Sequence, residues 1–102
     1  MVKKIVVFWR DIPSQVIVQR GRTREKMMLS SRFQEAIDRA AMRAGKGSSD
    51  AYIAEWRRET TRCDADADLK LLAEQEAAHL EAGFSDAQLL ELIRNHGAAV
   101  RQ

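Results

Sequence analysis

The stretch Lys3-Lys4-Ile5-Val6-Val7-Phe8-Trp9-Arg10 decides the fold, because its apolar side chains would fall on both faces of an extended strand. This pattern is typical of a central strand of a sheet. Residues 11–14 contain the proline and serine of a turn, and the β-branched run Gln15-Val16-Ile17-Val18-Gln19 follows them. The sequence therefore predicts an N-terminal β-hairpin.

The segment after this hairpin, residues 20–29, is expected to prolong the second strand, with Gly21 as a bulge or a bend. In an extended chain its alternate cations would project to one side as a basic ridge made of Arg20, Arg22, Arg24 and Lys26. Such a ridge can hold phosphates or carboxylates. Alternating charge also protects an edge strand from unwanted pairing, so both interpretations stay open.

Three later segments have the patterns of helices. In the first, Ser31 and Gln34 predict a capping box and Gly45 predicts the C-terminal stop. Its buried stripe is expected at Phe33, Ala36, Ile37, Ala40, Ala41 and Ala44. The second helix is expected from the aspartates of residues 64–68 to Gly83, and the third from Ser85, with a capping box to Gln88, to residues 95–97.

Residues 51–62 fit either a strand or a helix. We favour a strand, because Tyr52, Trp56 and two threonines have high β-propensity and a lone hairpin needs a third strand. The expected fold is α+β. It is a small three-stranded, mainly antiparallel sheet with helices on one face and the element order ββαβαα.

The 102 residues, of which 45% are hydrophobic, suit a single domain over 1–102, with a core at 3–96 and a frayed tail at 97–102. No apolar run is long enough to span a membrane, and we expect a cytoplasmic protein. Residues 1–62 hold 14 basic and 7 acidic residues (+7), and residues 63–102 hold 3 and 8 (−5), in agreement with the total of +2. The basic half could face an anionic partner, or the two halves could neutralise each other.

Residues capable of metal or nucleophilic chemistry are few and not in recognisable spacings. The aspartates at 64, 66 and 68 resemble the start of a calcium loop, but Leu69 and Gln75 stand where that loop needs glycine and glutamate. The three soft or nitrogen ligands, Cys63, His79 and His96, form no zinc motif. We therefore expect no cofactor, no metal and no catalytic site.

Tryptophan and arginine pairs follow the apolar residues of two predicted strands. The tryptophans could pack in the core, or one could anchor a partner, since Trp and Arg are enriched at interface hot spots. The candidate anchors are Trp9, Arg10, Tyr52, Trp56 and Arg57.

Several runs together resemble the small bacterial domain known as the conserved "virulence factor" domain. They are Lys4-Ile5-Val6-Val7-Phe8-Trp9-Arg10-Asp11-Ile12-Pro13, Gln15-Val16-Ile17-Val18, Arg32-Phe33-Gln34-Glu35-Ala36-Ile37-Asp38-Arg39-Ala40-Ala41-Met42-Arg43, Asp50-Ala51-Tyr52 and Glu55-Trp56-Arg57. The likeness covers most of residues 3–60 and fades after Cys63. It implies no activity and no catalytic residue; for a chain that stands alone it implies an accessory subunit, associated with folate-linked one-carbon enzymes.

The leading hypothesis is a non-enzymatic protein-interaction module or accessory subunit of a bacterial complex. It predicts an exposed cluster around Tyr52, Trp56 or the Met27-Met28 pair. One alternative is a nucleic-acid or phosphate-binding domain that uses the basic ridge, and the other is a minor enzyme subunit that contributes Cys63 or a histidine to a shared site. The partner is expected to be a protein, and the oligomeric state stays open.

Overall fold

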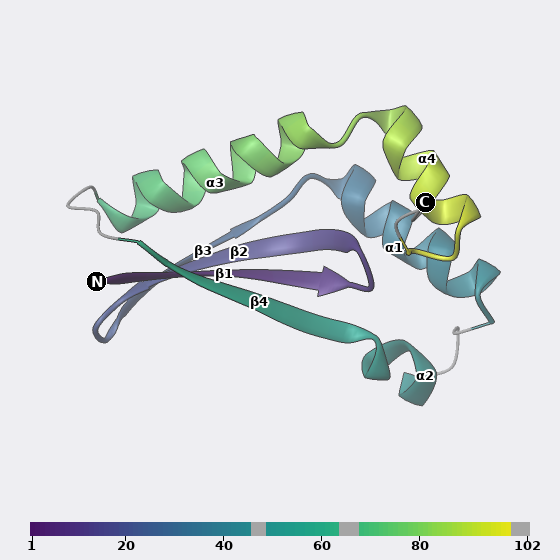
Figure 1. Ribbon diagram of the computed structural model, residues 1–102, viewed down its shortest axis with the longest axis horizontal. Helices are drawn as coiled ribbons and strands as arrows, with labels where there is room; N and C mark the ends of the chain where they lie inside the picture. The colour runs from purple at the N-terminus through teal and green to yellow at the C-terminus, as the bar shows by residue number, and fades with distance from the viewer. Residues whose placement is uncertain (46–48, 64–67, 99–102) are drawn as a thin grey trace.

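The computed structural model describes residues 1–45, 49–63 and 68–98, and helices cover one face of an antiparallel sheet (Figure 1). The elements are β1 (Val2–Trp9), β2 (Ile12–Arg20), β3 (Thr23–Met28), α1 (Ser31–Arg43), α2 (Ser49–Ala54), β4 (Trp56–Cys63), α3 (Leu69–Gly83) and α4 (Asp86–Arg94). The sheet has four strands in the spatial order β3-β2-β1-β4, and each neighbouring pair is antiparallel. The expected α+β class is confirmed, whereas the three-stranded sheet and the element order ββαβαα are wrong.

The additional strand arises at Gly21, where the chain makes a tight hairpin instead of the expected bulge or bend. Arg20 pairs with Thr23, so Gly21 and Arg22 alone form the loop. The φ of Gly21 is +60°, which glycine adopts at little cost, and a glycine at the first loop position is typical of a type II′ turn. The chain therefore doubles back, and β3 lies beside β2.

Residues 51–62 contain both of the structures that the sequence allowed. Residues up to Ala54 form α2, and β4 begins at Trp56. The expected strand is correct for the second part of the segment and wrong for Tyr52, which lies on a helix. β4 pairs with β1 without interruption from Trp9↔Trp56 to Val2↔Cys63, which makes β1 a central strand.

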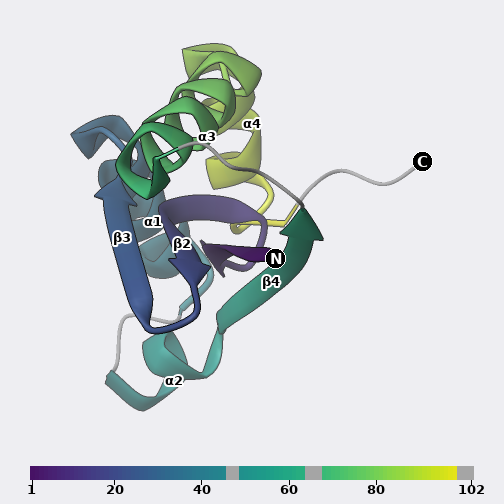
Figure 2. The ribbon, with the colours of Figure 1, turned by 90° about the vertical axis from the view of Figure 1, so that its left-hand side faces the viewer.

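The main core lies between the sheet and three helices. α3 crosses β2 and β3, and α1 packs against β2 and α4 (Figure 2). The predicted stripe of α1 is buried at five positions, namely Phe33, Ala36, Ile37, Ala40 and Ala41. These side chains meet Val16 and Val18 of β2 and apolar residues of α3 and α4. None of the described helices is long and apolar enough to cross a membrane.

Trp9 is completely buried at the end of β1, where several parts of the chain meet. Its Nε1 donates a hydrogen bond to the Tyr52 carbonyl oxygen at 2.9 Å, and the two rings stack with centroids 5.9 Å apart. Gly97, which the sequence predicts to lie in a frayed tail, is buried, and its carbonyl oxygen accepts a hydrogen bond from Asp11 N at 2.9 Å. Residues 99–102 lie outside the described residues.

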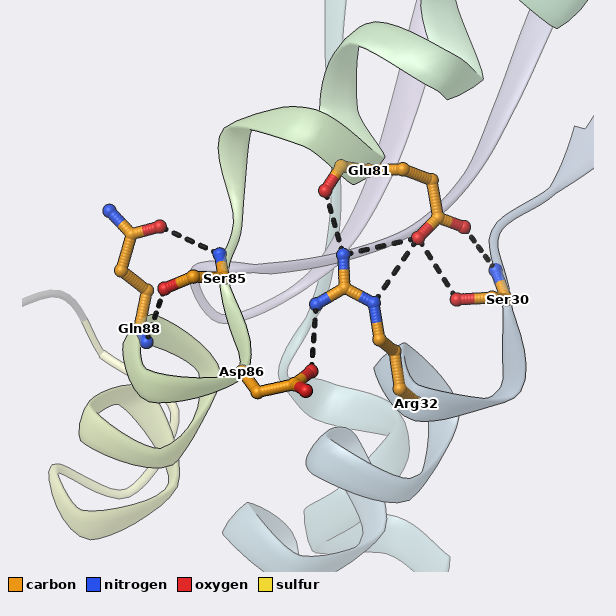
Figure 3. Close-up of polar contacts among 6 residues, drawn as sticks. All are labelled: Ser30, Arg32, Glu81, Ser85, Asp86 and Gln88. Carbon is orange, nitrogen blue, oxygen red and sulfur yellow. Dashed lines mark hydrogen bonds and ion pairs between the residues drawn. The ribbon is translucent and has the colours of Figure 1, made fainter.

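The start of α1 differs from the capping box expected at Ser31. The N-cap is Ser30, whose hydroxyl and backbone N–H donate to the Glu81 carboxylate at 2.9 and 2.6 Å instead of capping the helix (Figure 3). Arg32 donates to the same carboxylate at 3.2 Å and to the Glu81 carbonyl oxygen at 2.7 Å. It also pairs with Asp86 at 3.3 Å. One carboxylate and one guanidinium thus tie α1 to the end of α3 and the start of α4.

The start of α4 agrees with the prediction. Ser85 Oγ accepts a hydrogen bond from Gln88 N at 3.1 Å, and Gln88 Oε1 accepts one from Ser85 N at 2.8 Å (Figure 3). This capping box satisfies two backbone donors that the helix itself cannot pair. It fixes the position of Asp86, the first residue of α4, which forms the ion pair with Arg32.

The pKa of the Glu81 carboxyl lies below its ordinary value of 4.5. Burial alone would raise this pKa, but the hydrogen bonds from Ser30 and the hydrogen bond and charge of Arg32 lower it by more. A carboxyl whose pKa is lower in the folded than in the unfolded state stabilises the fold above its unfolded pKa. That stabilisation is lost as the pH falls through the folded pKa.

Replacement of Gly97 by alanine should destabilise the protein more than the same change at Gly21. Both glycines have positive φ, +90° and +60°, and each alanine costs roughly 1 kcal/mol of backbone strain. At Gly97 the new Cβ would also lie 2.8 Å from Trp9 Cζ3, and the buried ring has no room to retreat. We expect Gly97→Ala to cost about 1–3 kcal/mol beyond Gly21→Ala in urea unfolding. Equal losses would show that Trp9 does not pack on this turn.

Glu81→Gln should remove a pH-dependent part of the stability. At neutral pH the variant should lose about 1 kcal/mol of unfolding free energy, because the carboxylate is partly exposed and its hydrogen bonds are partly replaced by water. The difference from the wild type should shrink as the pH falls below 4.5. Glu74→Gln, on the exposed side of α3, is the matched control and should show no such trend. A constant difference across this pH range would refute the role given to Glu81.

Candidate functional site

One face of the sheet is covered by α1 and α3, and the other is here called the open face. The open face carries five exposed cationic side chains: Lys3, Arg24, Lys26, Arg58 and Arg62. Residues directly opposite in antiparallel strands share a face. Lys3 pairs with Gln19 and with Arg62, and Gln19 pairs in turn with Arg24. The two acidic residues of the strands, Glu25 and Glu59, alternate to the covered face. The open face of the four strands therefore has five positive charges and no negative charge.

The centre of the open face is aliphatic. Ile5, Val7 and Ile17 form a cluster that contains no helix residue, yet they are only 6–8% exposed. Long cationic side chains cover such residues with their methylene groups and keep the charged heads in water. A shallow cavity of about 350 Å³ is lined by Ile17 and by four polar or charged side chains, Gln15, Arg24, Lys26 and Arg58. The open face thus combines an apolar centre with a cationic margin.

Gln15 is one of the residues that line this cavity. Its Oε1 is buried and has no hydrogen-bond partner among the described residues. A buried polar atom without a partner is uncommon, and it could accept a hydrogen bond from a bound molecule. The cavity therefore offers one amide group among its cations.

The five cations of the open face form no ion pair within the described residues. Other cations are engaged in holding the fold together. Lys4 pairs with Glu76 of α3 at 3.3 Å, and Arg10 pairs with Glu55 at 3.3 Å. The cations of the open face are therefore available to an anion from outside the chain.

Arg57, on the covered side of β4, is one of the structural cations. Its guanidinium lies 4.4 Å from the centroid of the Phe8 ring, and it donates to the Arg10 carbonyl oxygen at 2.7 Å and to Asp11 at 2.9 Å. It also pairs with Glu59. Burial lowers the pKa of Arg57, but the hydrogen bonds and charges of Glu59 and Asp11 raise it by more. These contacts fix β4 against the loop after β1.

The basic ridge expected from the sequence is divided by the hairpin at Gly21. Arg24 and Lys26 lie on the open face, whereas Arg20 lies on the covered face and Arg22 lies in the turn. The expectation of a single row was wrong because it assumed an unbroken strand. The residues that complete the basic surface come instead from β1 and β4.

The five candidate anchors occupy different environments. Trp9 is fully buried and has no surface for a partner, and Arg10 donates to the His96 carbonyl oxygen at 2.9 Å. Tyr52 and Trp56 are half-buried, and their rings meet edge to face with centroids 5.7 Å apart. Trp56 also packs against the apolar cluster of the open face. Arg57 is held within the chain, so Tyr52 and Trp56 keep the accessible aromatic surface.

The exposed cluster predicted around the methionines is limited. Met28 is 54% exposed at the end of β3, opposite Gln15, whereas Met27 is half-buried against the core. Met28 therefore lies at a corner of the open face. It adds apolar surface beside the cavity.

The outer edge of β4 presents backbone groups that form no ladder with any described strand. Arg10 N donates to the Glu55 carbonyl oxygen in the register of the β1–β4 pair, so alternate residues from Glu55 onward direct their backbone groups to β1. The residues between them direct their N–H and C=O groups outward, and these are Trp56, Arg58, Thr60 and Arg62. Because β4 is the last strand of the sheet, no described strand pairs with this edge. Arg58 and Arg62 thus offer outward backbone groups as well as side chains on the open face.

The residues considered for catalysis do not come together. Cys63 lies opposite Val2, and His96 contacts Arg10 just beyond the other end of β1. Eight residues of strand separate these points by about 26 Å. His79 is exposed on α3, and the described residues contain no group of three His, Cys, Asp or Glu side chains that could hold a metal ion. Of the run that resembles the start of a calcium loop, residues 64–67 lie outside the described residues, and the later positions from Leu69 to Gln75 form the start of α3.

A second concave surface lies between α1 and α4. Two adjoining cavities of about 480 and 260 Å³ share Arg39 and Ile93. Met42, which is 74% exposed, lines the larger cavity. The charged residues around the two cavities are of both signs, including Asp38 and Arg43. This groove shows no preference for a charged partner.

Amide hydrogen exchange should reveal the free edge of β4. In the protein alone, the amides of Glu59 and Thr61, which face β1, should exchange at least about tenfold more slowly than those of Arg58, Thr60 and Arg62. The comparison is internal to one strand, so global stability affects both sets alike. Equal protection along β4 would mean that its outer edge is already paired.

Comparison with known proteins gives one family. The model of the Virulence factor family matches residues 7–93, which extends the likeness seen in the sequence beyond Cys63 and into α4. No curated protein and no solved structure matches the chain. The family match includes the end of β1, the whole of β2, β3 and β4, and all helix residues except Arg94. The chain therefore belongs to the Virulence factor family.

Proposed function

We propose that this protein is a non-enzymatic interaction module that binds an acidic segment of a partner protein on its open face. The observation that carries the proposal is the set of five cations around an aliphatic centre, which form no ion pair within the described residues and have no acidic side chain of the four strands among them. Complementary charge steers association and selects partners, and burial of the apolar surface that Met28 and Trp56 leave exposed beside the centre adds affinity. A partner with acidic residues beside aliphatic ones fits both features.

The aliphatic centre favours a protein over a nucleic acid. Single-stranded nucleic acids bind to sheets largely by stacking bases on exposed aromatic rings. On the open face Trp56 is half-buried and edge-on to Tyr52, and the middle positions are Ile5, Val7 and Ile17. A nucleic acid would gain affinity from the cations only. It is the alternative that nuclease treatment and the salt dependence of binding, described below, distinguish.

The family name points to a role in virulence, and the proposed activity is compatible with it. An accessory subunit of a larger bacterial complex would act through such a docking surface. The resemblance to stand-alone domains associated with folate-linked one-carbon enzymes suggests one class of complex in which to look for the partner.

Charge reversal on the open face should abolish partner binding without unfolding the protein. Lys26 and Arg58 are exposed and lie on different strands, so Lys26→Glu with Arg58→Glu should lower affinity for the native partner at least about tenfold, or ~1.4 kcal/mol. The measurement is quantitative affinity capture from native cells, followed by mass spectrometry. Arg43→Glu with Lys70→Glu, on exposed parts of α1 and α3, changes the net charge by the same amount and is the matched control.

The control variant should retain the partner that the open-face variant loses. A partner that is retained by both variants, or lost from both, would contradict the proposal. Bound material that nuclease removes, with affinity that falls steeply with salt, would identify a nucleic-acid ligand instead.

A further inference from the structure

We infer that the acidic partner segment binds in an extended conformation as a fifth strand along the outer edge of β4. This inference rests on the proposed function, and it specifies how the partner is held. Three features of β4 carry it: the outward backbone groups, the placement of two arginines, and the charge pattern that opposes pairing with a second copy.

The backbone of β4 can form a regular ladder with an added strand. Arg58, Thr60 and Arg62 each direct both N–H and C=O groups away from β1. A strand beside them would form hydrogen-bonded pairs with these three residues. The strand is eight residues long, from Trp56 to Cys63, and its middle contains two threonines, which favour extended structure. The free edge is therefore long enough to accept a partner segment.

The side chains of the same residues select for acidic residues. In an antiparallel or parallel ladder the partner residue opposite each β4 residue projects from the same face. Partner residues opposite Arg58 and Arg62 would be four positions apart and would lie on the open face beside a guanidinium. Carboxylates fit there, because both guanidiniums are exposed and form no ion pair among the described residues.

The partner position between the two acidic residues would lie opposite Thr60. Thr60 is next to Ile5 of the apolar cluster. A β-branched side chain fits at this position, since it would extend the apolar centre of the open face toward the new strand. The expected recognition pattern is thus an acidic residue, any residue, a β-branched residue, any residue and a second acidic residue.

The charges of β4 oppose pairing with a second copy of the chain. Two antiparallel registers would pair the outward groups of β4 with a second copy over the greatest length. One places Arg58 opposite Arg62, and the other places Glu59 opposite Glu59. Like charges directly opposite each other are destabilising in a sheet. The edge therefore discourages self-association and accepts an acidic strand.

The other edge of the sheet, β3, is less suited. It is six residues long, and α3 packs against it, whereas no described helix packs to a similar extent against β4. Its cations Arg24 and Lys26 are on the open face, so they could attract the same partner from a distance. Their contribution and that of the β4 edge can be separated experimentally.

The test uses the full chain and a defined probe. The probe is a synthetic peptide of alternating threonine and valine with two glutamates four positions apart. A control peptide has the same composition with the glutamates three positions apart, which places them on opposite faces of an extended strand. The first peptide should bind at least about tenfold more tightly than the control in fluorescence anisotropy. On binding, the outward amides of Arg58, Thr60 and Arg62 should become protected from hydrogen exchange.

A proline variant isolates the backbone ladder from the charges. The Thr60 N–H points away from β1, so Thr60→Pro should leave the sheet folded, as proline is tolerated at such edge positions. It should lower peptide affinity at least about tenfold, whereas Thr60→Ala should retain most of the binding. If Thr60→Pro does not fold, the exchange measurement on the wild type decides the question alone.

The outcomes separate this inference from the proposed function. Binding without protection of the three amides, protection at Arg24 and Lys26 instead, or no discrimination between the peptides would overturn strand addition. The proposed function would then still stand if Lys26→Glu with Arg58→Glu abolishes binding of the native partner. Insensitivity of the native partner to that double variant would end the proposed function itself.

Discussion

The contact between Trp9 and Tyr52 is the interaction on which the rest of the arrangement depends. The indole N–H is bonded to the Tyr52 carbonyl oxygen, and the stacked rings hold the short helix α2 against the end of β1. The chain then continues directly into β4, with Trp56 opposite Trp9. The position of one buried side chain therefore sets the register of an edge strand that begins many residues later. Gly97 closes the same site from the other side, because only a residue without a Cβ fits against the indole ring.

The register of β4 decides which charges face outward on the open face. In the observed register Arg58 and Arg62 lie on that face with Lys3, Arg24 and Lys26, while Glu59 pairs with Arg57 on the covered side. A slip of one residue would exchange the two sets and would bring Glu59 into the middle of the cations. The contacts of Arg57 with Phe8, Asp11 and the Arg10 carbonyl oxygen oppose such a slip. The open-face cations of β4, which form no ion pair within the described residues, are thus positioned by the contacts of Arg57.

Local patterns in the sequence predicted the parts of the fold that depend on neighbouring residues. The first hairpin, the buried stripe of α1 and the capping box of Ser85 with Gln88 follow from spacings of a few residues. The second hairpin was missed because glycine also marks bulges, although Gly21 followed by one further residue has the length of a type II′ loop. Tyr52 was misplaced because its aromatic ring favours a strand, whereas in the structure the contact with Trp9 holds it on a helix. The Ser30 side chain forms no cap hydrogen bond with α1, and its hydroxyl is directed instead to the distant Glu81 carboxylate, to which it donates.

The candidate site was only partly predictable for the same reason. Arg24 and Lys26 stood out because they alternate along one strand, but Lys3, Arg58 and Arg62 gave no local signal. They join the others only through the pairing of β4 with β1. Chemical-shift mapping of the labelled protein during titration with the acidic peptide tests strand addition at β4 most directly. Strand addition predicts that the largest amide shifts fall on Arg58, Thr60 and Arg62, with smaller shifts at Arg24 and Lys26. Shifts concentrated at Met42 and Ile93, in the groove between α1 and α4, would contradict it.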